Sequence, residues 1–265
     1  MVNAADIIIT SLETMTAFNI VDGSFRWIMD ELQNATIATS EDKVDITGKQ
    51  GRKLSSLKRN KAVTVSGTNG VISAGLLETQ TGNKFKVGET LVMYPEFLKV
   101  ADNKASTTYT AVGTTGAEIV GIRLRDASGT LTQEFTQDTA AGEGTFAYDP
   151  DTKEITFADG AIADGSEIAV FYNRKIEAAT LENLSDTYSE KVSLYIDAIG
   201  EDKCANIYRV QFYIPKADFD GNFEITLGDD QAVHAFNAEA LAGACGASGA
   251  LWTYTIFGAD AEDVA

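Results

Sequence analysis

The chain has 265 residues, of which 39 are acidic and 21 are basic, so its formal net charge is -18. Because most affinity for duplex nucleic acid comes from neutralising phosphates with Lys and Arg, this charge excludes a conventional duplex-binding protein. Apolar residues make up 44% of the chain, which is enough for a packed core in one or two domains. No apolar run approaches the length of a membrane helix. Residues 1–6 lack the basic and apolar regions of a signal peptide.

The charge is unevenly distributed along the chain. Residues 43–104 carry eleven basic and five acidic residues, whereas the segments on either side are strongly acidic. A solvated loop and a nucleic-acid patch are both possible interpretations of such a basic run. The acidic remainder disfavours the second of these, and we interpret the run as an assembly loop that meets an acidic face of another copy. Its basic residues are Lys49, Arg52, Lys53, Lys58, Arg59 and Lys61.

The predicted elements are mostly short strands. Runs rich in Thr, Val, Ile and aromatic residues alternate with turns of Gly, Asp and Asn, which is typical of β structure. One short helix is predicted over 69–80 with Gly82 as its C-cap, and 235–242 fits either a helix or a strand. The sequence therefore predicts a mainly β protein, a sandwich with one helix against it. In chain order the predicted strands are 62–66, 86–94 (ended by Pro95), 118–125, 153–157, 167–172, 192–199, 207–214, 223–227 and 252–257.

One segment differs in character from the rest. Residues 113–173 are richer in Gly, Thr and Asp turns and predict two or three short hairpins. We interpret this segment as an insertion or a small β-subdomain. The main sandwich domain is then formed by 1–112 and 174–265.

Catalytic and metal-binding patterns are weak. The single histidine, His234, lies among small apolar residues, which predicts a packed or edge-exposed strand residue. Cys204 and Cys245 also have small or apolar neighbours and are predicted to be buried thiols of a protein made in a reducing cytosol. A dyad of His234 with either cysteine is conceivable, but no family signature surrounds them.

Acidic residues give no clearer catalytic pattern. The segment 218–224 faintly resembles a calcium loop, but its ligand spacing fails and Asp220-Gly221 favours a turn. Paired carboxylates cannot be singled out among 39 acidic residues. We therefore expect no cofactor, no metal and no enzyme activity.

Two parts of the chain resemble a known family. From Asp30 to Gly82 a strand at 35–39, an acidic turn, the basic segment and a Thr/Ser-rich strand lead into a small-residue segment that contains Leu76-Leu77. This order is similar to that of the major tail tube proteins of tailed bacteriophages. Residues 206–223 and 234–241 are also similar to phage and prophage tube proteins.

The resemblance implies a specific assembly. Tail tube subunits share a β-sandwich with one flanking helix, and six copies form a ring whose inner strands close into a continuous barrel. A long hairpin, here about 41–61, reaches the neighbouring ring, and terminal segments, here 1–20 and 257–265, help to lock rings together. The partners would be other copies, tail proteins at the tube ends and passing duplex DNA that is not held tightly, with no membrane involved.

The same resemblance implies where the protein acts and how its charge is used. It would be a virion protein of the phage tail, assembled in the host bacterial cytoplasm, and its tube would conduct DNA during ejection. Acidic residues are expected to line the bore, because they repel DNA, and 113–173 is expected on the outer surface.

Three alternatives remain at this point. A capsid decoration or head–tail joining protein would share the acidic, β-rich character but would not polymerise into tubes. A bacterial surface module with an immunoglobulin-like sandwich is disfavoured by the lack of a signal peptide. An enzyme is disfavoured by the weak catalytic patterns.

Overall fold

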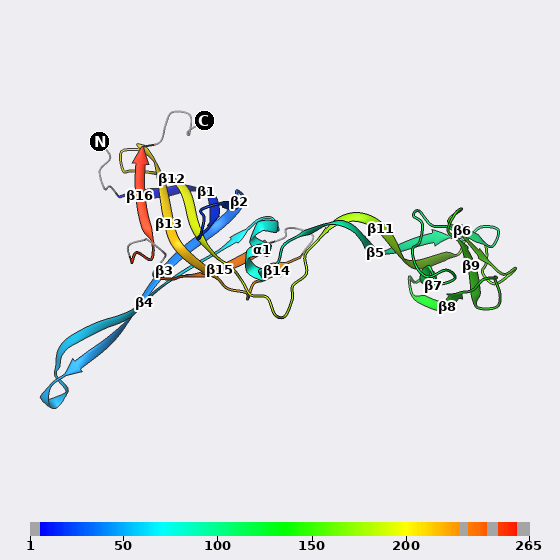
Figure 1. Cartoon of the computed structure of the whole chain (residues 1–265), viewed down its shortest axis with the longest axis horizontal. Coiled ribbons are helices and arrows are strands. Elements are labelled where there is room, and N and C mark those ends of the chain that lie inside the picture. The colour runs from blue at the N-terminus through cyan, green and yellow to red at the C-terminus, as the bar shows by residue number, and fades with distance from the viewer. Residues whose placement is uncertain (1–5, 228–232, 243–248, 259–265) are drawn as a thin grey trace. The chain divides into compact units, whose positions relative to one another are not determined.

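The computed structural model describes residues 6–227, 233–242 and 249–258, and it divides the chain into two compact units (Figure 1). Unit 1 comprises Met1–Phe85 and Leu181–Ala265, and unit 2 comprises Lys86–Thr180. Strands dominate both units, which confirms the prediction of a mainly β protein. Among the described residues, no helix is long and apolar enough to span a bilayer.

Unit 1 is built around one antiparallel sheet. Its strand order is β2-β1-β12-β13-β15-β4-β3, with β14 added to β15 and β16 added to β13. The sheet curls around a shared core, which receives side chains from β1 and β12 as well as from β4 and β15. Met15, Val65, Leu194 and Phe236 are examples of this shared core. The strands are β1 (Ile8–Asn19), β2 (Phe25–Met29), β3 (Leu32–Thr47), β4 (Lys53–Asn69), β12 (Lys191–Glu201), β13 (Ile207–Phe219), β14 (Ile225–Thr226), β15 (Val233–Ala240) and β16 (Thr253–Gly258).

The helix α1 (Ala74–Thr81) packs against this core, which confirms the predicted flanking helix. Gly82 ends it in the left-handed conformation, with φ 70°, and its N–H donates to the Glu78 carbonyl. The helix starts five residues later than predicted. Asn69 is instead the buried last residue of β4, and its side chain donates to the Val71 carbonyl at 2.8 Å. Ser73 then caps the first turn by accepting from the Leu76 N–H.

His234 joins α1 to the sheet. It is fully buried on β15, which confirms the prediction of a packed strand histidine and shows that 233–240 is a strand. Its Nε2 lies 2.7 Å from Oε1 of Gln80, and its Nδ1 accepts from the Ser73 N–H at 3.3 Å. This pair of contacts requires the neutral imidazole with the proton on Nε2. Burial lowers the pKa of His234 below its usual value.

Unit 1 should therefore lose stability in mild acid. In the unfolded chain the histidine binds a proton at about pH 6.5, whereas in the folded protein the pKa is lower. The contribution of neutral His234 to the free energy of unfolding is therefore complete above about pH 6.5 and declines as the pH falls below it. His234→Gln should be less stable at pH 7 but should lose this dependence between about pH 6.5 and 5. Urea unfolding followed by tryptophan fluorescence measures it, because Trp27 and Trp252 both lie in unit 1. If the free energy of unfolding depends on pH equally in the wild type and in His234→Gln, buried neutral His234 is not the cause of the acid sensitivity.

Unit 2 has its own sheet and its own core. The strand order is β5-β11-β7-β8-β9-β10-β6, antiparallel except for a short parallel pairing of β8 with β9. Ile122, Phe135, Phe146 and Tyr172 are fully buried in the core. The strands are β5 (Lys86–Lys99), β6 (Lys104–Ser106), β7 (Ile119–Arg125), β8 (Leu131–Gln137), β9 (Thr145–Asp149), β10 (Glu154–Phe157) and β11 (Glu167–Thr180).

The bounds of unit 2 differ from the segment singled out in the sequence. That segment, 113–173, lies inside the unit, which begins at Lys86 and ends at Thr180. The difference arises from β5 and β11, which pair over all fourteen residues of each strand, from Lys86 opposite Thr180 to Glu167 opposite Lys99. Such long-range pairing leaves no local signal in the sequence.

Two prolines lie inside strands, contrary to the prediction that Pro95 ends one. Pro95 lies on β5, which is an edge strand and pairs only with β11. An edge strand tolerates proline, since the missing N–H can face the open side. Pro215 lies on β13 next to a register shift in the pairing with β12, where a bulge removes the need for a ladder hydrogen bond.

The cysteine prediction was wrong for Cys204, which is exposed. It lies in the β12–β13 turn, where the Asp202 carboxylate accepts the N–H groups of Cys204 and Asn206. Its small neighbours therefore belong to a turn and not to the core, and these hydrogen bonds, led by those from Asn206, lower the pKa of Asp202. Cys245 lies outside the described residues.

Candidate assembly surfaces

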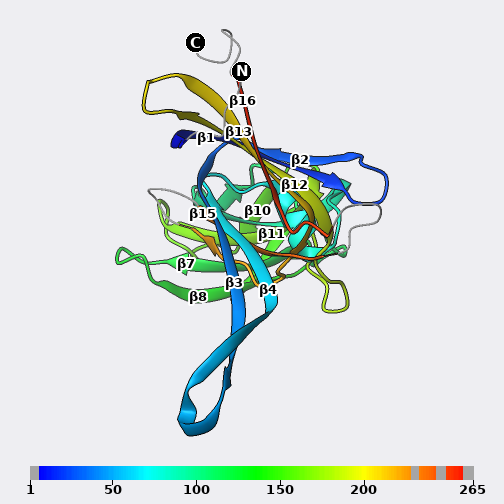
Figure 2. The ribbon, with the colours of Figure 1, turned by 90° about the vertical axis from the view of Figure 1, so that its left-hand side faces the viewer.

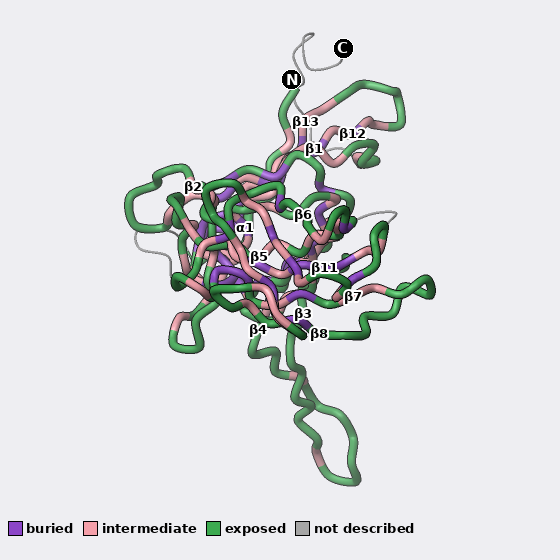
Figure 3. The backbone as a smooth tube through the Cα atoms, turned by 90° about the vertical axis from the view of Figure 1, so that its right-hand side faces the viewer, coloured by how far each residue is buried: buried purple, intermediate pink, exposed green. Residues whose placement is uncertain are grey.

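The basic segment forms the end of a long hairpin, which we call the arm and define as residues 41–61. β3 and β4 leave the sheet of unit 1 as a two-stranded ribbon and continue to a tight turn (Figure 2). Nearly every residue of the arm is exposed (Figure 3). At about 3.3 Å per residue, the seven residues 41–47 alone extend about 20 Å.

Local interactions fix the arm where it begins and where it ends. At its base the register shifts between Ser40 and Asp42, and Asn60 adopts a positive φ of 52° while its amide donates to the Asp42 carboxylate at 2.8 Å. At its tip Gln50 and Gly51 both have positive φ, and the Gly48 N–H donates to the Arg52 carbonyl at 2.7 Å. The hairpin is therefore an ordered projection.

The arm has two chemically different faces. Val44 lies directly opposite Leu57, and Ile46 follows Val44 two residues later on the same face. Leu57 is 58% exposed, and Val44 and Ile46 are also exposed. Lys43 lies opposite Lys58 on the other face. An apolar face of this kind on a projecting ribbon is typical of an interaction surface.

The six predicted basic residues all lie on the arm and are all exposed. The Lys53 Nζ is 2.6 Å from a carboxylate oxygen of Asp45, and the Lys58 Nζ is 2.6 Å from one of Glu41. The hydrogen bond from Lys58 is the main reason that the pKa of Glu41 is lowered. In the part of the chain that the structure describes, no ion pair forms at Lys49, Arg52, Arg59 or Lys61. These four charges remain available for a partner.

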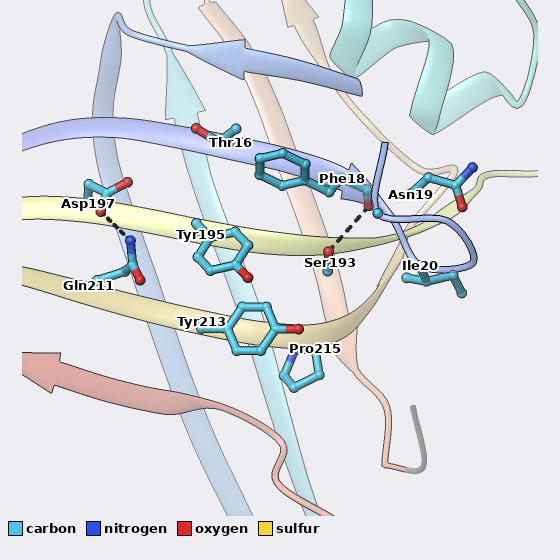
Figure 4. Close-up of a pocket in the computed structure, with 11 residues that line it drawn as sticks. Thr16, Phe18, Asn19, Ile20, Ser193, Tyr195, Asp197, Gln211, Tyr213 and Pro215 are labelled. Carbon is cyan, nitrogen blue, oxygen red and sulfur yellow. Dashed lines mark hydrogen bonds between the residues drawn. The ribbon is translucent and has the colours of Figure 1, made fainter. Parts of the chain in front are cut away.

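A second surface is the face of β1, β12 and β13 that points away from the core. The rings of Tyr195 and Tyr213 stack with centroids 4.5 Å apart, and Phe18 meets Tyr195 edge-on (Figure 4). The Gln211 amide donates to the Asp197 carboxylate at 2.9 Å. These side chains line an open groove of about 590 Å³, and burial beside Tyr213 raises the pKa of Tyr195.

This groove is polar but weakly charged. Among the described residues that line it, Asp197 is the one acidic residue and there is no Lys or Arg. Within the described ranges, no cluster of three or more His, Cys, Asp or Glu is arranged to hold a metal ion. The surfaces described are suited to contact with other molecules.

An amphipathic arm and an uncovered sheet face beside a curled β core are typical of a structural protein with contact surfaces. The chain belongs to the YomU/Tube protein family, whose model matches residues 7–253. This confirms the resemblance to phage tail tube proteins, so the chain is a structural component of a phage tail tube. A search of curated proteins found no match.

Proposed function

We propose that the protein forms hexameric rings that stack into a tube, and that phage DNA passes through this tube during ejection. The arm is the observation that carries the proposal. A surface that projects from one copy and fits a different surface on the next makes a heterologous contact, which does not close and therefore yields a filament. The exposed edges of β-sheets in single subunits are paired or covered in such an assembly.

In this proposal the basic and the apolar residues of the arm have separate roles. The four unpaired basic residues attract the acidic surface of a copy in the adjacent ring and set the register of the contact. The apolar face formed by Val44, Ile46 and Leu57 supplies most of the affinity once it is buried. Surface ion pairs contribute about 0–1 kcal/mol each, whereas burying an aliphatic side chain contributes about 1.5–3 kcal/mol.

The proposed bore is suited to passing DNA. Lys and Arg on its wall would bind phosphates at every step along the duplex. The groove on the uncovered face of β1, β12 and β13 is lined by neutral polar groups, including Tyr195, Tyr213 and Gln211, and by the carboxylate of Asp197. We assign this face to the bore. The acidic bore expected from the sequence stays a prediction, because Glu201 of β12 and Arg209 of β13 lie on the same face outside the groove.

Charge reversal tests the arm's role in stacking. Arg52→Glu/Arg59→Glu should raise the concentration needed for assembly by about tenfold, because two attractive contacts per subunit become repulsive. Assembly of the unmodified protein should also weaken between about 0.05 M and about 0.5 M salt. The matched control is Glu41→Gln/Lys58→Gln, which removes one ion pair within the arm without changing the net charge and should assemble like the wild type. Sedimentation velocity measures the assembly of each variant and its dependence on salt. If neither Arg52→Glu/Arg59→Glu nor added salt weakens assembly, the basic residues do not steer the contact.

A further inference from the structure

Unit 2 has an apolar face that no other part of unit 2 covers. From Met93 to Lys99 its edge strand β5 alternates between exposed and partly buried residues. Tyr94 and Leu98 pack on the core of unit 2, whereas Leu91, Met93 and Phe97 are about half exposed. Since side chains two residues apart share a face, these residues form one continuous stripe, with Pro95 between Met93 and Phe97.

The neighbouring strands extend this face. Phe171 of β11 lies opposite Pro95, and Gly121 of β7 lies opposite Phe171 on the next strand. A Cβ added at Gly121 would meet nothing within 4 Å, so the surface beside Phe171 is open. Val120, at the register shift of β7, is 63% exposed.

Two ion pairs lie at the margins of this stripe. The Lys175 Nζ lies 2.5 Å from a Glu89 carboxylate oxygen, and Arg125 lies 2.7 Å from one of Glu167. The guanidinium of Arg125 also stacks over the Phe97 ring at 4.8 Å. Lys99 and Glu177 lie toward opposite ends of the same ladder, so the margins carry charges of both signs and no excess of positive charge that would favour DNA. The chemistry of the stripe matches another apolar protein surface.

The open edge of β5 limits how that surface can bind. β5 pairs with β11 on one side only, which normally invites strand addition. Pro95 lies within the ladder with β11, so its missing N–H faces the open edge and interrupts any added strand. The contact is then made by side chains across the face, with Met93 and Phe97 as its centre.

We propose that this stripe is a subunit contact, covered by a second copy of this chain in the assembled tube. The inference rests on the proposed function, because only an assembly places a copy beside every unit 2. We choose a second copy as the partner because members of a tube family assemble with themselves, so other copies are present wherever the tube forms. An uncovered apolar edge would otherwise be an aggregation hazard in every free subunit.

Met93 provides a probe that needs no substitution. It is 48% exposed, whereas Met15 and Met29 are buried in unit 1. Hydrogen peroxide should oxidise Met93 readily in dilute subunits, because oxidation of methionine follows exposure of its sulfur. In assembled tubes, the rate measured by mass spectrometry should fall about tenfold or more at Met93. Met15 and Met29 should react slowly in both states.

The outcomes separate the contact from the proposed function. Tubes in which Met93 oxidises at the rate of the free subunit would overturn the contact alone. This result is also expected if a different tail protein occupies the face. Failure of the purified protein to form tubes or rings at any concentration would overturn the proposed function and the contact together.

A pair of variants tests the energetic role of the stripe. Met93→Asp/Phe97→Asp should raise the assembly concentration about tenfold or more, with the fold unchanged because both positions are half exposed. Met93→Leu/Phe97→Tyr keeps the apolar surface and should assemble normally. Thr139→Asp adds a negative charge at an exposed turn of the same unit and should also assemble normally. Normal assembly of the first variant would overturn the proposal.

Discussion

Replacing the apolar face of the arm with carboxylates should abolish tube formation without unfolding the subunit. Val44 and Leu57 lie opposite each other on an exposed ribbon, so Val44→Asp/Leu57→Asp removes no packing from the core of unit 1. Burial of two aliphatic side chains contributes about 3–6 kcal/mol to a contact, so their loss should raise the assembly concentration at least about 100-fold. This increase in the assembly concentration is larger than the increase expected from reversing the charge of Arg52 and Arg59.

The measurement compares folding and assembly in the same samples. Circular dichroism and tryptophan fluorescence should be those of the wild type, while sedimentation velocity should show only small species. The control Val44→Ile/Leu57→Met keeps the apolar surface and should assemble like the wild type. If the Asp variant forms tubes at the wild-type concentration, the apolar face of the arm is not a subunit contact.

The largest loss of stability should follow Gly82→Ala. Gly82 has a φ of 70°, which costs a residue with a side chain about 1 kcal/mol. A Cβ at this position would also lie 2.0 Å from the Tyr188 carbonyl oxygen. That clash with backbone forces the end of α1 away from the 187–190 segment, where the Glu190 N–H donates to the Thr79 carbonyl. We expect a loss of about 2–4 kcal/mol in the free energy of unfolding of unit 1.

Gly23 provides the matched control for this substitution. Its φ is 68°, but a Cβ there would meet nothing within 4 Å. Gly23→Ala should therefore cost only the conformational strain, about 1 kcal/mol. Urea unfolding monitored by tryptophan fluorescence compares both variants in unit 1. Equal losses for Gly23→Ala and Gly82→Ala would show that the approach of Tyr188 does not constrain the helix end.

Local patterns in the sequence predicted much of unit 1. The basic run from Lys49 to Lys61 marked the arm, because a dense charge run is visible without knowledge of the fold. Gly82 marked the end of α1 for the reason that glycine alone adopts the left-handed conformation readily. The alternating runs at 192–199 and 207–214 correctly predicted β12 and β13, although β13 extends through Pro215 to Phe219.

Other features depended on long-range pairing and could not be predicted locally. β1 and β2 were not predicted, and β1 lies between β2 and β12, so its residues Ile8–Asn19 belong to the sheet. Of the segments expected to lock rings together, 1–5 and 259–265 lie outside the described residues.

The apolar face of the arm was missed although a signal was present. Val44 and Ile46 alternate with charged residues in 42–46, which is the period of a strand with one apolar face. The basic residues around them dominated the interpretation. Only the register, which places Leu57 opposite Val44, shows that these residues share a surface.

Electron cryomicroscopy of the purified protein at high concentration and low salt tests tube assembly most directly. We expect hollow tubes of stacked sixfold rings, with the arm of each subunit contacting the adjacent ring and with β1, β12 and β13 facing the bore. A monodisperse monomer under these conditions, or tubes in which the arm points freely into solvent, would contradict this expectation.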